Sequence, residues 1–282
     1  MRTSRDGRRR GRPVLRRQEA HAARAAGRPG PVKGLAVDLG SSGIRAWVTG
    51  QGLVTGGPAG WEDAATRPVR RGRIVDADTC AGLLGRLADT ALGADREGSA
   101  VVLSHPVLAG REHRATAREL LASLGASRAV VLNSAGAVAR SAGDPAGGPV
   151  LVVDMGAGLT EVALLVDGTV VDARQADAGL GDLDPGSVPA ELARNVLDMI
   201  TSMWREDRHG AVRGALRRGP VLTGGGALRR DVTDRITGCL GVPVRIAPDP
   251  STAVVRGAAL FLDSVLCPAV EGKATVRPVR LR

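Results

Sequence analysis

Two aspartates in this sequence each end an apolar run and precede a turn of very small residues. Asp38 stands in GLAVDLGSSG, and Asp154 stands 116 residues later in VLVVDMGAGLT. Both carboxylates can project from strand ends into one shared cleft. A hydrated Mg²⁺ there would keep several of its waters and need only one or two carboxylates. We therefore predict Asp38 and Asp154 as metal-binding residues and Mg²⁺ as a cofactor.

The turns after these aspartates are suited to phosphate groups. Missing or tiny side chains let backbone N–H groups approach phosphate oxygens, and serine or threonine hydroxyls add donors. A third cluster, in VLTGGGAL, runs from a strand through three glycines into a helix, which can hold a ribose or phosphate. The predicted cofactor-binding residues are Gly40, Ser41, Ser42, Gly43, Gly156, Ala157, Gly158, Thr160, Gly224, Gly225, Gly226, Ala227 and Leu228.

The elements that carry these turns form an internal repeat. Residues 34–50 and 150–166 each read as an apolar strand, a turn and a second alternating strand. Either turn alone is most simply a glycine-rich hairpin, but the repetition favours a duplicated α/β fold with a mixed five-stranded sheet in each half. Further strands are expected near residues 100–104 and 129–132, with a helix after each.

Together these motifs resemble those of the actin-like ATPase superfamily. VDLGSSG is similar to its first phosphate motif, VVDMGAGLTEVAL to the second, and VLTGGGALRR to its adenosine motif. Within the superfamily, three segments resemble the MreB/Mbl family of bacterial actins: GREHRATARELLASLGAS, RPVRRGRIVDADTCAGLL and VPVRIAPDPSTAVVRGAAL. The resemblance covers most of residues 34–266. It implies an actin-like (duplicated ribonuclease-H-like) fold, two halves around a nucleotide cleft, and ATP with Mg²⁺ as cofactors.

The sequence departs from the family pattern where hydrolysis is concerned. The stretch between the second phosphate motif and TGGGAL is short, and residues 51–66 replace most of the opposing small subdomain, so we expect a shortened form with reduced small subdomains. Asn133-Ser134-Ala135 stands where the family has Glu-Glu-Pro, whose glutamate positions the attacking water. Neither Asn nor Ser is a comparable base. Asp154 and Ser134 are the predicted catalytic residues, and we expect weak or absent ATPase activity.

The net charge of +10 over 282 residues is concentrated at the N-terminus. Residues 1–33 carry ten arginines and Lys33 against two acids, with few bulky apolar residues, so a disordered tail is expected. Such a tail could contact anionic lipid or nucleic acid, although a mis-assigned start or a solvated extension explains it equally well. The expected domains are a basic tail (1–33), an N-terminal actin-like half (34–145), a C-terminal actin-like half (146–266) and a basic C-terminal tail (267–282).

Cysteine usage and hydropathy bear on location. Cys80, Cys239 and Cys267 are scattered and odd in number, which indicates reduced packing thiols in a cytoplasmic protein rather than a metal site. No apolar run approaches the roughly twenty residues that span a bilayer, and the tail lacks the apolar core of a secretory signal. We expect a cytoplasmic protein without a transmembrane segment, associated with the membrane at most through its tail.

Four functions follow from these features. The leading hypothesis is an MreB-like cell-shape protein that binds ATP, self-associates and works with cell-wall morphogenesis proteins, with hydrolysis and polymerisation reduced. The alternative is a compact DnaK-like chaperone similar to the ethanolamine-utilisation chaperone family. A sugar or acetate kinase would need an acceptor site, for which the chain has little insertion. A nucleic-acid-binding regulator would use the tail, but no zinc-finger spacing or RNA-binding aromatic motif supports it.

Overall fold

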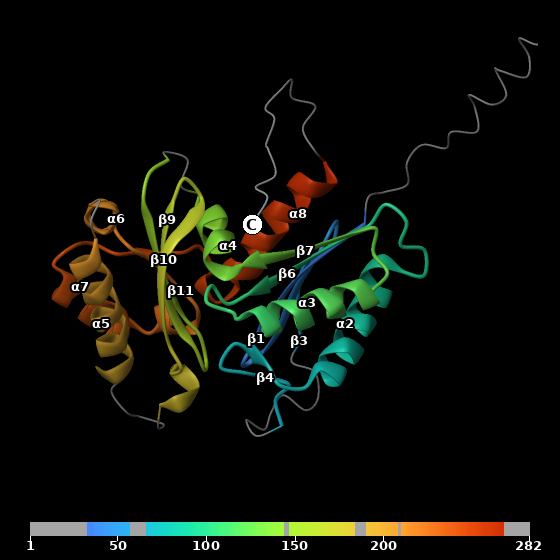
Figure 1. The fold of residues 1–282 in the computed structure, drawn as a ribbon, viewed down its shortest axis with the longest axis horizontal. Helices are drawn as coiled ribbons and strands as arrows, with labels where there is room; N and C mark the ends of the chain where they lie inside the picture. The colour runs from blue at the N-terminus through green and yellow to red at the C-terminus, as the bar shows by residue number, and fades with distance from the viewer. Residues whose placement is uncertain (1–32, 57–65, 144–146, 184–189, 208–209, 268–282) are drawn as a thin grey trace, which may run out of the picture. The chain divides into compact units, whose positions relative to one another are not determined.

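The computed structural model describes residues 33–56, 66–143, 147–183, 190–207 and 210–267 (Figure 1). Both expected tails, apart from Lys33 and Cys267, and part of segment 51–66 lie outside these residues. The chain from Lys33 onward is one compact unit. Within the described part of this unit, every helix is too short or too polar to cross a bilayer.

The first sheet has five strands in the order β3-β2-β1-β6-β7. β1 and β2 form an antiparallel hairpin, β3 continues it, and β6 and β7 run parallel to β1. The strands are β1 (Gly34–Gly40), β2 (Gly43–Val48), β3 (Gly52–Gly56), β6 (Ala100–His105) and β7 (Arg128–Asn133). Asp38 therefore lies near the end of the central strand β1, just before the hairpin turn, as predicted.

The second sheet repeats this arrangement in the order β10-β9-β8-β11-β12. Its strands are β8 (Val150–Met155), β9 (Thr160–Val166), β10 (Thr169–Ala176), β11 (Val221–Thr223) and β12 (Arg245–Ile246). Asp167 and Gly168 both adopt positive φ angles, 49° and 75°, as a two-residue hairpin turn requires. Because hairpins and parallel strands occupy the same positions in both sheets, the predicted duplication of a mixed five-stranded sheet is confirmed.

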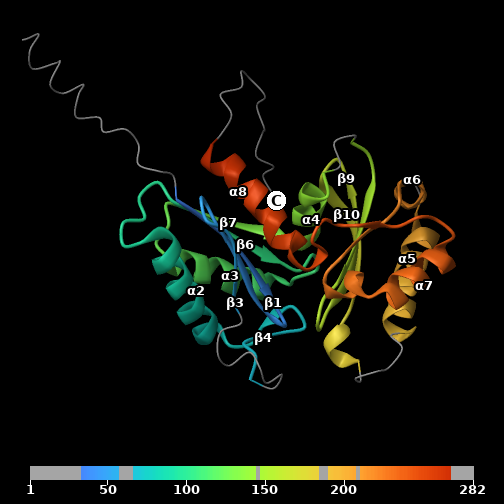
Figure 2. The same ribbon diagram turned by 180° about the vertical axis from the view of Figure 1, so that it is seen from behind.

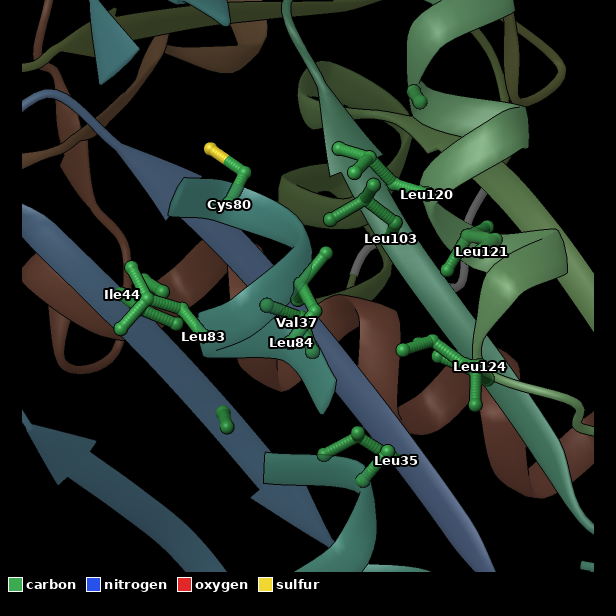
Figure 3. Packing of buried hydrophobic residues seen from close by; sticks show 14 of the residues in the cluster. Leu35, Val37, Ile44, Cys80, Leu83, Leu84, Leu103, Leu120, Leu121 and Leu124 are labelled. Atoms are coloured by element: carbon green, nitrogen blue, oxygen red, sulfur yellow. The ribbon is translucent and has the colours of Figure 1, made fainter. Parts of the chain in front are cut away.

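Helices cover one outer face of each sheet. They are α2 (Ala77–Leu92) and α3 (Arg111–Ser123) on the first sheet, and α5 (Ala190–Glu206), α6 (Ala211–Arg218) and α7 (Arg230–Leu240) on the second. Figure 3 shows Leu84 of α2 and Leu121 of α3 over Val37 and Leu103 of the sheet. Cys80 is buried in this core, whereas Cys239 and Cys267 are exposed, so the prediction of packing thiols holds only for Cys80.

Two further helices, α4 (Ser134–Ser141) and α8 (Ala253–Leu266), lie between the sheets (Figures 1 and 2). α4 follows the first sheet in the chain but packs its Ala137 and Val138 with strands of the second. α8 follows the second sheet but packs Ala258 and Leu262 with strands of the first. The sequence predicts a boundary between the two halves at residues 145 and 146. Because α4 and α8 each pack on the sheet of the other half, the packing does not separate at that boundary, which stays a prediction.

Short elements connect these layers near the strand ends. A two-stranded ribbon consists of β4 (Val69–Arg70) and β5 (Arg73–Ile74), and precedes α2. Three single-turn helices are η1 (Leu180–Asp182), η2 (Gly225–Leu228) and η3 (Pro250–Thr252). Between β10 and β11, the described residues contain only η1, α5 and α6, which agrees with the short stretch that the sequence showed there.

Candidate functional site

A cavity of about 310 Å³ lies where the central strands of both sheets end. This volume falls at the small end of the range of about 300–1,000 Å³ typical of ligand sites. Eleven of the residues predicted from the sequence line it, and they come from both sheets. They are Asp38, Gly40, Ser41, Ser42, Ser134, Asp154, Gly156, Ala157, Gly158, Gly224 and Gly225. The repeat and the third glycine cluster therefore meet in one place.

Five predicted residues lie outside the cavity lining for structural reasons. The hydroxyl of fully buried Thr160 donates to the Ala178 carbonyl at 2.8 Å, so it holds β9 to the end of β10. Leu228 is 62 % exposed, and Ala227 is buried in the core between the second sheet and helices α5, α6 and α7. Gly43 pairs with Gly40 in the first hairpin, and Gly226 lies against the Met155 side chain. These residues shape the turns without facing the cavity.

Gly224 shows why the third cluster needs glycine. Its φ angle is 78°, and a Cβ there would lie 2.6 Å from an Asp154 carboxylate oxygen and 2.4 Å from the Met155 carbonyl oxygen. Its N–H donates to the Pro250 carbonyl at 2.9 Å, which joins η2 to η3. Only glycine tolerates both this backbone angle and this close approach. The cluster brings the backbone directly beside Asp154.

Asp38 has a partly compensated charge. One carboxylate oxygen accepts a hydrogen bond from the Ser104 hydroxyl at 2.8 Å, and the other lies 4.0 Å from an Arg45 guanidinium nitrogen. Arg45 stands directly opposite Asp38 in the β1–β2 hairpin, so the two side chains share one face. Burial raises the pKa of Asp38, while Arg45 and Ser104 act in the opposite direction.

Glu161 is a third carboxylate in the cavity that the motif analysis did not single out. It is only 5 % exposed, and its two oxygens accept the Val107 N–H at 2.7 Å and the Ser134 hydroxyl at 3.1 Å. Burial is the main reason that its pKa is raised to about 7. The hydroxyl of Ser134 is thus directed at a carboxylate of the protein.

Glu161 also influences Asp154. They stand opposite in the β8–β9 hairpin, as Asp38 and Arg45 do in the first. Burial, then the charges of Glu161 and Asp38, raise the pKa of Asp154 to about 7, and Arg45 opposes them. The sequence repeat could have predicted these cross-strand pairs, because Arg45 follows Asp38, and Glu161 follows Asp154, by seven residues.

The donor set fits a nucleotide with a hydrated cation. Among the described residues, no group of three or more His, Cys, Asp or Glu side chains is placed to hold a metal ion directly. Two carboxylates from different sheets, beside turns of small residues, suit Mg²⁺ bound through water and phosphate oxygens. The turns at Gly40–Ser42 and Gly156–Gly158 can offer backbone N–H groups to those phosphates.

Two duplicated sheets whose hairpin turns face a common cavity define the class of actin-like proteins, and solved structures agree. MreB5 of Spiroplasma citri bound to ADP matches with a TM-score of 0.72 and 17 % identity, covering 85 % of this chain and 99 % of that chain. The MamK double helical filament matches at 0.65 and 15 %, covering 83 % and 99 %. EutJ from Carboxydothermus hydrogenoformans matches at 0.52 and 20 %, covering 83 % and 91 %. At these identities the likeness shows the fold.

The sequence narrows this class to one family. Residues 62–185 and 187–267 match the model of the MreB/Mbl protein family, so the chain belongs to the MreB/Mbl family. The matched residues begin after the first hairpin, and the Asp38 turn is therefore identified by the internal repeat and the fold. The search of curated proteins found no matching sequence.

Proposed function

We propose that this chain is an MreB-like cell-shape protein that binds ATP with Mg²⁺ in the cavity between its sheets. The observation that carries the proposal is the convergence of Asp38, Asp154 and both small-residue turns on that cavity. Two crystal structures of one similar protein support it: MreB5 of Spiroplasma citri has been crystallised with ADP and with AMPPNP. By fold, EutJ is a less similar match, and no feature of the site favours the chaperone alternative.

Each cavity residue has a distinct part in this proposal. Asp38 and Asp154 hold the hydrated cation, and backbone N–H groups of the two turns bind the phosphates. Gly224 and Gly225 face the nucleoside end, since they open η2 beside Asp154. When bound, Mg²⁺ supplies charge neutralisation for the phosphates. Asp154 must lose its proton for this, which cation binding favours.

Hydrolysis is proposed to be slow. Ser134 has no basic group, and its hydroxyl is hydrogen-bonded to Glu161 at 3.1 Å. Glu161 is a carboxylate, but its other oxygen accepts the Val107 N–H at 2.7 Å, so both of its oxygens are engaged within the protein. Asp154, Ser134 and Glu161 together can orient a water, but a base at position 134 is missing. We therefore expect turnover well below that of family members with the complete glutamate motif.

Self-association and location complete the proposal. The MamK match is to a double helical filament, and assembly of this chain into polymers is proposed on that likeness. Cell-wall morphogenesis proteins are the proposed partners. We place the protein in the cytoplasm, with residues 1–33 as the segment that would contact an anionic membrane.

Isothermal titration calorimetry with ATP and ADP tests the binding step. We expect saturable binding of both nucleotides with Mg²⁺ and a marked loss of affinity when EDTA replaces the metal. Equal affinity with and without Mg²⁺ would remove the carboxylates from the site. No binding of either nucleotide at millimolar concentration would overturn the proposed function.

A further inference from the structure

The β4–β5 ribbon, residues 69–74, connects the two halves through ion pairs. A guanidinium nitrogen of Arg71 lies 3.0 Å from an Asp182 carboxylate oxygen, and one of Arg73 lies 3.3 Å from Asp177. Both aspartates follow β10 of the second sheet, whereas the ribbon follows the first hairpin. Two arginines of one short ribbon thus reach across to the same segment of the other half.

The tip of this ribbon also touches the first phosphate turn. The Gly72 N–H donates to the Ser41 hydroxyl oxygen at 3.3 Å. A Cβ on Gly72 would lie 2.6 Å from the Leu159 side chain and 2.7 Å from the Pro106 ring. Leu159 belongs to the second hairpin turn and Pro106 follows β6 of the first sheet, so the tip lies between the two halves.

The aspartate that pairs with Arg71 is tied to the second phosphate turn. The other oxygen of Asp182 accepts the Gly179 N–H at 2.9 Å. The next two N–H groups donate to that turn, Leu180 to the Gly156 carbonyl at 3.0 Å and Gly181 to the Ala157 carbonyl at 2.7 Å. A continuous series of contacts therefore runs from Ser41 through the ribbon and residues 179–182 to the second turn.

We propose that Arg71 and Arg73 are positioning residues that hold the two phosphate-binding turns at their working separation. With both ion pairs formed, the two turns grip the phosphates of one nucleotide, and release requires the pairs to part. The inference rests on the proposed nucleotide binding, which it deepens by assigning control of nucleotide release to the ribbon.

The exposure and backbone conformation of these residues fit a contact between the two halves that forms and breaks readily. The paired side chains are 49 % and 39 % exposed for Arg71–Asp182, and 67 % and 44 % for Arg73–Asp177. Exposed ion pairs are weak and screened by salt, so neither locks the cavity permanently. Arg71 adopts a φ angle of 48°, an unfavourable conformation for a non-glycine residue that its surroundings must hold in place.

Hydrogen exchange of the nucleotide-free protein tests the coupling directly. Arg71→Ala should speed exchange of the Leu180 and Gly181 amides, by a factor of about two to five for one exposed pair. Arg70→Ala is the matched control, because exposed Arg70 stands in the same ribbon without an ion pair among the described residues. Unchanged protection of these amides in Arg71→Ala would overturn the inference whether or not nucleotide binds.

A charge swap tests the effect on nucleotide release. Arg73→Asp and Asp177→Arg should each speed the release of a fluorescent ADP analogue, and the double variant should restore the wild-type rate. At about 1 M salt, where the screening length is near 3 Å, wild type should approach the single variants. Equal release rates in all four proteins would refute the role of the ribbon. Absence of binding in wild type would refute the proposed function, while hydrogen exchange would still decide the coupling.

Discussion

Opposite charges at equivalent positions distinguish the two aspartates of the cavity. Asp38 faces Arg45 across its hairpin, whereas Asp154 faces Glu161 across the other. Burial raises the pKa of both aspartates, but Arg45 opposes this effect at Asp38, whereas Glu161 adds to it at Asp154 and the pKa there reaches about 7. Near neutral pH, a bound cation would therefore favour loss of the Asp154 proton.

Asp154→Asn should change binding and stability in opposite directions. Without the carboxylate charge, Mg²⁺-dependent nucleotide affinity should fall by roughly tenfold to a hundredfold, since one carboxylate no longer neutralises the metal. The nucleotide-free protein should become more stable at pH 8, because a buried repulsion with Glu161 is removed. Calorimetry with Mg²⁺-ATP and urea unfolding measure the two effects.

Asp198→Asn provides the control for that experiment. Asp198 is exposed on α5, away from the cavity lining, and its substitution removes the same charge. It should alter neither measurement. If Asp154→Asn also kept its affinity, Asp154 would have no part in holding the metal.

Helices α4 and α8 cross in close contact between the sheets. A Cβ added to Gly257 would lie 1.7 Å from the Ala137 carbonyl oxygen, and that neighbour is backbone. Each of these helices packs on the sheet of the other half. The separation of the two sheets, and so the width of the cavity, depends on how closely these helices approach.

Gly257→Ala should therefore destabilise the protein despite the higher helix propensity of alanine. Overpacking of a tight core typically costs about 1–3 kcal/mol, more than the roughly 1 kcal/mol that alanine gains in a helix. Urea unfolding should show a lower midpoint than wild type. Gly85→Ala on α2 is the matched control, since nothing lies within 4 Å of its added Cβ, and it should be neutral or stabilising. A stabilised Gly257→Ala protein would contradict the tight crossing.

The hairpins and helices could be predicted from the sequence because their signals are local. An apolar run, a turn of small residues and Asp167-Gly168 each specify backbone geometry within a few residues. The exchange of α4 and α8 between sheets has no local signal, since both helices have apolar faces that would fit either sheet. The ion pairs of Arg71 and Arg73 join residues more than 100 positions apart, and only the fold brings them together.

The residues of the candidate site also include some that the local sequence predicts and some that it does not. The sequence predicts Asp38 and Asp154 because each ends an apolar run before a turn of small residues. Arg45 and Glu161 were not predicted, although the equal spacing in both hairpins would have placed each opposite an aspartate. Thr160 was assigned to phosphate by its type, but its hydroxyl is used by the Ala178 carbonyl. Whether a polar group is available for a ligand depends on neighbours that the local sequence does not reveal.

For the whole molecule, folding brings three carboxylates of two sheets into one cavity and opposes their ionisation. The pKa values of Asp154 and Glu161 are both raised to about 7, chiefly by burial, from ordinary values of 3.8 and 4.5. Between these limits the folded chain binds more protons than the unfolded chain. The free energy of unfolding of the nucleotide-free protein must then fall as pH rises through this range.

Two histidines act in the opposite direction at lower pH. Burial lowers the pKa of His105 and of His113 from 6.5, so the unfolded chain binds more protons there and stability rises as pH approaches 6.5. Because the unfolded histidines are still half protonated at pH 6.5, this stabilising effect continues for about one further pH unit and then ends. The raised pKa of Cys80, about 11, acts only at alkaline pH. Between pH 6.5 and 8.5 the destabilisation from the two cavity carboxylates therefore exceeds the remaining stabilisation from the histidines.

Nucleotide-free protein should accordingly lose stability between pH 6.5 and 8.5, by on the order of 1 kcal/mol, since the histidines offset part of the carboxylate effect. Glu161→Gln should flatten this profile and stabilise the protein at pH 8.5, because it removes one titrating group and its repulsion of Asp154. The amide can keep both contacts, accepting from the Val107 N–H and donating to the Ser134 hydroxyl. Mg²⁺-ATP should stabilise wild type more at pH 8.5 than at 6.5, since it binds the ionised carboxylates. Urea unfolding across this interval measures each profile, and a wild-type stability that rises with pH there would show that the cavity carboxylates are already ionised in the folded protein.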